Sequence, residues 1–178
     1  VYGIPQTIPI PEEHPTDPIC SYGITKLTIE KYLSLYRHLH GLESVVLRMA
    51  NPYGERQNIF NVQGAVAVFL GRTLLRKPIS IWGDGSVARD YFYIGDLASA
   101  VLTVAESETP SHVYNIGGGR TLSLNDLLAT IRKVTGESPM VEYKPARPLD
   151  VPINCLAIGR AKRELGWEPR TDLEIGIE

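Results

Sequence analysis

Residues 44–49 read SVVLRM, a short run in which apolar and polar side chains do not alternate. This pattern is typical of a strand that is covered on both faces in a parallel sheet. Before this run, Ile24, Leu27 and Leu35 recur at near-helical spacing. Gly41 then suits the left-handed turn that follows a helix. A helix followed by a buried strand predicts an α/β architecture.

The flanking regions extend this architecture. Residues 4–18 contain five prolines, which predict an ordered loop because proline disrupts helices and lacks the amide that a strand donates. Ser123 and Asp126 form a capping pair, and Gly166 suits the end of a short last helix. We expect helices at residues 64–76, 96–106, 123–134 and 160–165, strands at 79–82 and 113–116, and a tight turn at 83–85.

Composition excludes several classes of protein. Among 178 residues, 43% are hydrophobic and 21% charged, as in ordinary globular domains, and the net charge of -2 argues against nucleic acid as a partner. The longest apolar run, residues 65–70, is far shorter than the ~20 residues that span a membrane. With two cysteines and no secretory signal, we expect a cytoplasmic protein. Because the chain begins with Val1, we also expect it to be a processed or partial polypeptide.

Tyr22 and Lys26 are the first candidates for chemistry. They lie four residues apart on the first predicted helix and therefore share one face. A nearby ammonium favours the phenolate form of a phenol, so the pair could remove a proton from a hydroxyl group. The same spacing also occurs on many solvated helices, but the position directly after a proline-rich loop favours a cleft.

Other polar groups allow two interpretations each. The turn at residues 117–119, Gly-Gly-Gly between a strand and a helix, resembles a phosphate-binding turn, and a plain glycine connection explains it equally well. Arg48, Arg89 and Arg147 could bind a pyrophosphate or form ion pairs. The four histidines and two cysteines lack the spacing of a zinc site or a cysteine nucleophile, so we predict no metal.

Six blocks of sequence together resemble a known family, the extended short-chain dehydrogenases/reductases, and within it the NAD-dependent UDP-sugar 4-epimerases. They occur in the family's order over nearly the whole chain. The blocks are VYG (1–3), YGITK (22–26), RMANPYGERQ (48–57), GDGSVARDYFYIGD (83–96), YNIG (114–117) and RPLD (147–150).

The resemblance implies a fold and a reaction. It implies an α/β fold made of the later part of a Rossmann-like parallel sheet and a small substrate-binding domain. The first part would comprise residues 1–57 and 86–116, and the second 58–85 and 117–178. Tyr22 would be the catalytic base, Lys26 would hold the ribose of the cofactor NAD, and the substrate would be a UDP-sugar. A full-length protein would form a homodimer.

The resemblance also implies a substrate site. Asn51, Arg89, Arg147 and Asp150 would bind the phosphates and ribose. Trp82 would stack on the uracil base, although a core tryptophan after a buried strand is an equal alternative. The segment that includes Gly64 and Ala65 resembles the epimerases and would also contact the substrate.

Asn154 would line the sugar pocket. Because asparagine is smaller than tyrosine and can hydrogen-bond an acetamido group, we expect N-acetylated sugars to be accepted. Cys155 could line the pocket instead, because the register around this position departs from the family pattern.

Two departures leave alternatives open. Leu149 stands where the family commonly has glycine, and the glycine-rich first turn for NAD would lie about 100 residues upstream of Val1. A sugar-nucleotide 4,6-dehydratase shares the Tyr-x-x-x-Lys pattern, and its deciding acidic residues would also precede Val1. A fragment that binds a nucleotide sugar, or packs on a partner, without catalysis is the third interpretation.

Overall fold

Parallel strand pairs form the framework of the chain. The computed structural model describes residues 1–61, 63–146 and 151–178. Strand β1 (Val46–Met49) runs parallel to β6 (Val113–Ile116), with Arg48 opposite Asn115. Two further pairs are also parallel: β2 (Asn51–Tyr53) with β5 (Tyr91–Tyr93), and β3 (Ile79–Trp82) with β8 (Val141–Lys144). The expected α/β class with parallel pairing is therefore confirmed.

A three-stranded sheet joins the segments between these pairs. Its middle strand is β4 (Ala88–Arg89). Strand β7 (Leu122–Ser123) is antiparallel to β4, and β9 (Ile153–Asn154) is parallel to it. The pairing with β9 places Asn154 opposite Arg89, 65 positions earlier in the chain.

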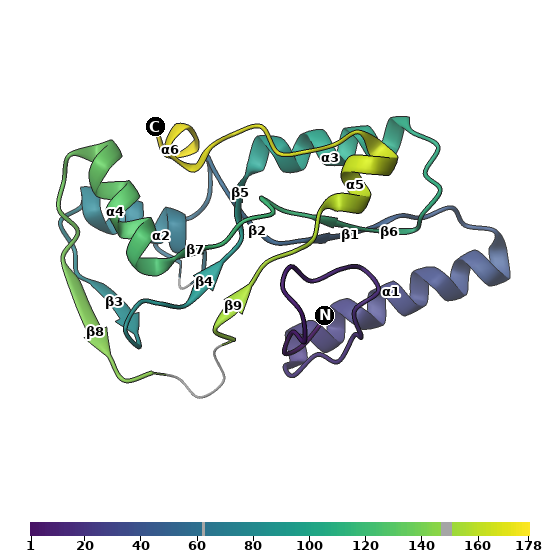
Figure 1. Cartoon of the computed structure of the whole chain (residues 1–178), viewed down its shortest axis with the longest axis horizontal. Helices are drawn as coiled ribbons and strands as arrows, with labels where there is room; N and C mark the ends of the chain where they lie inside the picture. The colour runs from purple at the N-terminus through teal and green to yellow at the C-terminus, as the bar shows by residue number, and fades with distance from the viewer. Residues whose placement is uncertain (62, 147–150) are drawn as a thin grey trace.

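Helices flank the strands. In Figure 1, α1 lies on one side of β1 and β6, and α3 and α5 lie on the other. The helices are α1 (Ser21–His40), α2 (Ala65–Leu74), α3 (Ile94–Glu106), α4 (Leu124–Thr135), α5 (Gly159–Leu165) and α6 (Leu173–Ile177).

The predicted helix ends are confirmed by their caps. Gly41 adopts a φ of 64° after α1, and its amide donates to the carbonyl of Arg37. Ser123 and Asp126 form a reciprocal capping box at the start of α4, which satisfies two amides that the helix itself leaves unpaired. Gly166, with a φ of 63°, ends α5.

Some expectations were incomplete. Strand β1 begins at Val46 rather than Ser44, and Met49 is 52% exposed, so the expectation of full cover on both faces is wrong at that end. The sequence patterns did not predict the short strands β2, β4, β5, β7, β8 and β9 or helix α6. Strands of two to four residues gain their hydrogen bonds from distant partners, and such short segments contain almost no periodic signal.

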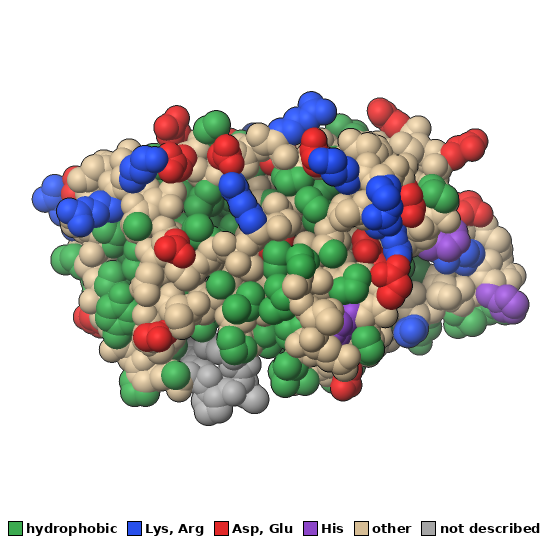
Figure 2. All heavy atoms as spheres, in the orientation of Figure 1, with side chains coloured by type: hydrophobic (Ala, Val, Ile, Leu, Met, Phe, Trp, Pro, Cys, Tyr) green, Lys and Arg blue, Asp and Glu red, His purple; other side chains and the backbone are tan. Residues whose placement is uncertain are grey.

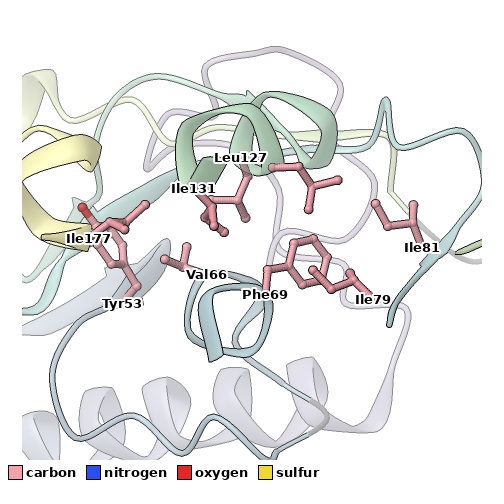
Figure 3. Close-up of a cluster of buried hydrophobic side chains, with 9 residues drawn as sticks. Tyr53, Val66, Phe69, Ile79, Ile81, Leu127, Ile131 and Ile177 are labelled. Atoms are coloured by element: carbon pink, nitrogen blue, oxygen red, sulfur yellow. The ribbon is translucent and has the colours of Figure 1, made fainter. Parts of the chain in front are cut away.

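The main apolar core lies between α2 and α4. Figure 3 shows Leu127 and Ile131 of α4 above Val66 and Phe69 of α2. Ile79 and Ile81 of β3 close the cluster at one end and are at most 1% exposed. Fully burying one such side chain contributes about 1.5–3 kcal/mol, so this cluster stabilises the lobe that α2 and α4 form.

A second core packs α3 and α5 against the central strands. Its buried members are Phe92, Ala100, Tyr114, Ile116, Ala161 and Trp167. The expected boundaries of the two domains stay a prediction.

The N-terminal loop is ordered, as expected. Ile10 is fully buried and forms an isolated parallel bridge with Leu156, just after β9. The bridge ties the loop that precedes α1 to the segment that follows Asn154.

Charges of both signs mix on the surface. Figure 2 shows Lys and Arg side chains among Asp and Glu side chains on one face, so that face has no field of a single sign. Within the described part of the chain, no helix is both long and apolar enough to cross a membrane.

Candidate functional site

Tyr22 and Lys26 lie together at the start of α1. The helix begins at Ser21, directly after Cys20 in an extended conformation. The Lys26 ammonium nitrogen lies 5.3 Å from the centroid of the Tyr22 ring. The Tyr22 side chain is 71% exposed. The predicted pair is therefore brought together, and its phenol is open to a substrate.

Three predicted substrate residues occupy short strands. Arg89 and Asn154 are paired residues on β4 and β9. Nη1 of the Arg89 guanidinium donates to the carbonyl oxygens of Ala88 (2.9 Å) and Val151 (2.7 Å), which holds the guanidinium in place. Asn51, at the start of β2, donates through its backbone and side-chain nitrogens to the carbonyl of Asp90, which follows Arg89.

Gly64 and Ala65 form the start of α2. Gly64 precedes the helix with a φ of 91°, and a Cβ there would lie 2.6 Å from Nε2 of Gln57. This position therefore requires glycine. The first amides of α2 have no side-chain cap, and such amides suit an anionic group.

Trp82 ends β3 and is 38% exposed. The Lys144 ammonium nitrogen lies 5.7 Å from the centroid of its ring. The alternative of a core tryptophan is therefore wrong, whereas stacking on a base stays a prediction. Arg147 and Asp150, the other two predicted substrate residues, lie outside the described residues.

Asp90 is the functional candidate that sequence reasoning missed. Its side chain is fully buried, and its carboxylate accepts hydrogen bonds from the amides of Gly118 (2.6 Å), Leu156 (3.2 Å) and Gly119 (3.3 Å). Burial raises the pKa of Asp90 to about 6, although these amides act to lower it. An acidic residue directly after Arg89, in a block otherwise rich in strand formers, was the available signal.

The same contacts decide the role of the glycine turn at residues 117–119. Its amides bind the chain's own carboxylate, so the interpretation as a phosphate-binding turn is wrong. A Cβ at Gly118 would lie 2.7 Å from the carbonyl oxygen of Tyr91 and 3.0 Å from Oδ1 of Asp90. Glycine is required there by this close approach.

Arg48 is a structural ion pair. Its guanidinium donates to both carboxylate oxygens of Glu30 on α1, with the shortest distance 2.6 Å, and lies 4.7 Å from the centroid of the Tyr2 ring. Both charged side chains are almost buried, at 11% and 13% exposure. Arg48 therefore anchors α1 to β1, and the alternative of a pyrophosphate ligand is wrong.

A second buried polar contact lies beside this anchor. The Tyr2 hydroxyl donates to Oδ1 of Asn115 (2.7 Å), and Nδ2 of Asn115 donates to the carbonyl of Ile10 (2.8 Å). Asn115 is fully buried on β6. The sequence blocks VYG and YNIG contain this pair, but neither residue was assigned a role from the sequence.

Burial makes the Cys155 thiol a weak nucleophile. Burial raises the pKa of the Cys155 thiol to about 11, and the nearby Asp90 adds to this rise. Cys20 is exposed at the start of α1. Among residues 1–61, 63–146 and 151–178, no group of three or more His, Cys, Asp or Glu side chains could hold a metal ion.

Comparison with known proteins identifies the family. The model of the NAD dependent epimerase/dehydratase family matches residues 1–117. The chain belongs to this family. The resemblance seen in the six sequence blocks is thereby confirmed, and the family is NAD-dependent.

Individual relatives share the fold over the whole chain. The epimerase/dehydratase chain is 33% identical to a UDP-glucose 4-epimerase of Mycolicibacterium smegmatis, covering 99% of this chain and 56% of the relative. It is 36% identical to a dTDP-4-dehydro-6-deoxyglucose reductase of Escherichia coli, covering 100% of this chain and 56% of that relative. A crystal structure of UDP-glucose 4-epimerase with UDP-glucose from Thermotoga maritima superposes with a TM-score of 0.93 and 40% identity, over 99% of this chain and 57% of that one.

The chain thus spans little more than half the length of these relatives. The two curated relatives also catalyse different reactions at similar identity. Family membership is therefore settled, whereas the reaction of the whole protein is a matter for proposal.

Proposed function

We propose that the whole protein to which this chain belongs is an NAD-dependent UDP-sugar 4-epimerase. The observation that carries the proposal is the exposed Tyr22 at the first turn of α1, with the Lys26 ammonium 5.3 Å from its ring. The TM-score of 0.93 with a UDP-glucose 4-epimerase that contains UDP-glucose supports the same reaction class.

Tyr22 removes the proton from the C4 hydroxyl of the sugar in this proposal. The Lys26 ammonium lies beside this phenol, and proton transfer by a placed group contributes roughly 10²–10⁴-fold to rate. The two side chains offer a hydroxyl and an ammonium on one helix face, which fits the ribose hydroxyls of NAD. When bound, NAD supplies the site that takes the hydride from C4 and returns it.

The substrate pyrophosphate and sugar would contact the neighbouring strands. Arg89 is a guanidinium donor for the pyrophosphate, Asn51 lies next to it, and Asn154 is its strand partner. The amides at Gly64 and Ala65 offer donors at a helix start, and Trp82 offers a ring for the uracil. Arg147 and Asp150 remain proposed ligands on the basis of the sequence alone.

Three further parts of the proposal concern organisation and location. We propose the same division as from the sequence, with residues 1–57 and 86–116 in the NAD-binding part and residues 58–85 and 117–178 in the sugar-nucleotide-binding part. A homodimer is proposed because α1 exposes large apolar side chains that suit a protein contact, and sedimentation of the whole protein tests it. These side chains include Ile24, Ile29, Tyr32, Leu35, Tyr36 and Leu39. The cytoplasmic location is proposed on the basis of the sequence alone.

Turnover by the whole protein tests the proposed reaction. We expect interconversion of UDP-glucose and UDP-galactose, and a loss of roughly 10²-fold or more in kcat for Tyr22→Phe with the fold intact. Tyr143→Phe, at a tyrosine on β8 that is 57% exposed and lies outside both the proposed site and the proposed dimer contact, is the matched control and retains the rate. Full activity in Tyr22→Phe would remove the proposed base. Formation of a 4-keto-6-deoxy sugar would instead establish the dehydratase, and binding without turnover would establish a non-catalytic binder.

A further inference from the structure

Asp90 lies between the three strand residues that are proposed to bind the phosphates and the sugar, Asn51, Arg89 and Asn154. It follows Arg89 directly, and its carbonyl accepts from both nitrogens of Asn51 at 3.0 Å. Its carboxylate accepts from the amide of Leu156, two residues after Asn154. One buried residue therefore connects the segments of Asn51, Arg89 and Asn154.

The remaining contacts explain why the connection is rigid. The other donors to the carboxylate are the successive amides of Gly118 and Gly119, and the Cys155 sulfur lies 4.0 Å from Oδ2. Successive backbone amides form a concave anion site, which here holds an internal carboxylate. An ionised carboxylate only accepts hydrogen bonds, so it satisfies three amides at once.

We infer that Asp90, next to Arg89, is a positioning residue for the proposed substrate site, because its backbone carbonyl holds Asn51 and its carboxylate holds the Leu156 amide beside Asn154. The inference rests on the proposed function. An amide at this position would turn an NH₂ group toward amides that themselves donate. The amides of Gly118, Gly119 and Leu156 then lose their shared acceptor. Asn51 keeps the backbone carbonyl of Asp90, and each proposed ligand side chain remains chemically intact.

Binding of UDP-glucose by the whole protein, measured by calorimetry, tests the inference with Asp90→Asn. We expect the Kd to rise about tenfold or more, as for loss of hydrogen bonds to a charged group, and kcat at saturating UDP-glucose to change much less. Asp96→Asn is the matched control, because Asp96 is also buried and also accepts from two backbone amides, those of Arg170 and Thr171. This control should lower the melting temperature but leave the Kd unchanged.

A second variant keeps the test independent of the folding of Asp90→Asn. Gly118→Ala retains the carboxylate but places a Cβ 2.7 Å from the carbonyl oxygen of Tyr91 and 3.0 Å from Oδ1 of Asp90. When the variant is folded, as circular dichroism checks, it should raise the Kd in the same way. An unchanged Kd in either folded variant, or an equal rise in Asp96→Asn, would reduce Asp90 to a general stability role. Failure of the wild-type protein to bind UDP-glucose would instead overturn the proposed function itself, and the inference with it.

Discussion

Helices α1 and α2 are attached to the molecule in different ways: α2 buries five of its ten residues, whereas α1 buries only Gly23 of its twenty. Apolar side chains such as Phe69 hold α2 in the core. A nearly buried ion pair between Glu30 and Arg48 holds α1. The proposed base, Tyr22, lies on the helix that is held by polar contacts.

This difference shows that the residues that stabilise the fold and the residues proposed for catalysis lie on different elements. The apolar core between α2 and α4 is the largest cluster of buried side chains among the described residues. Four proposed site residues, Tyr22, Asn51, Arg89 and Asn154, lie on elements joined by the buried polar groups of Arg48 and Asp90. Apolar contacts tolerate small shifts, whereas hydrogen bonds to charged groups fix both distance and direction. Polar attachment therefore suits side chains that must be placed accurately.

The largest expected effect comes from the apolar core. Phe69→Ala should lower the free energy of unfolding of this chain by about 3–5 kcal/mol, because it removes a buried aromatic side chain and leaves a cavity. Leu35→Ala on α1 is the matched control, at 45% exposure, and should cost about 0.5 kcal/mol or less. Urea denaturation measures both values. Equal losses would erase the contrast between the two helices.

The ion pair of α1 should give the next largest effect. Arg48→Met leaves the Glu30 carboxylate almost buried without its partner, and we expect a loss of about 3 kcal/mol in unfolding free energy. The exposed pair of Arg76 and Glu137 is the control, since its side chains are 79% and 46% exposed. Arg76→Met should change stability by about 1 kcal/mol or less.

A double variant sharpens this result. Arg48→Met combined with Glu30→Leu should recover much of the lost stability, because no unpaired charge remains. Additive losses in the double variant would show that the two side chains act independently.

Asp90 should give a smaller, pH-dependent effect. Burial raises its folded pKa to about 6 from 3.8, so the folded state holds this proton more tightly than the unfolded state. Its contribution to stability is therefore full below about pH 4 and falls as the pH rises to about 6, by on the order of 2–3 kcal/mol.

Asp90→Asn does not titrate and supplies the reference. The unfolding free energy of the wild-type chain minus that of the variant, followed by urea denaturation between pH 4 and pH 7, should decrease with rising pH. A difference that stayed constant, or increased, would show that the amides of Gly118, Gly119 and Leu156 outweigh the cost of burial.

Local signals in the sequence predicted part of this picture. Helices with a clear period and a capping residue, such as the one that Gly41 ends, were predicted to within a few residues. Tyr22 and Lys26 could be paired because one helix places them on one face. The short runs at residues 44–49 and 113–116 were predicted as strands, but their pairing as β1 and β6 was seen only in the structure.

The polar contacts between distant segments could not be predicted from local sequence patterns. Asp90 binds amides 28, 29 and 66 positions away, and no periodic pattern marks such a contact. The glycine turn at 117–119 looks the same in sequence whether it binds a phosphate or a carboxylate. Arg48 was likewise ambiguous until its partner Glu30 was seen 18 positions away on α1.

The central claim, that catalysis belongs to α1 and substrate binding to the strands beside Asp90, is tested most directly by the affinity of the whole protein for UDP-glucose. Calorimetry should show a Kd within about twofold of wild type for Tyr22→Phe and about tenfold weaker for Arg89→Ala, which loses hydrogen bonds to a charged phosphate. A tenfold loss of affinity in Tyr22→Phe together with an unchanged Kd in Arg89→Ala would contradict it.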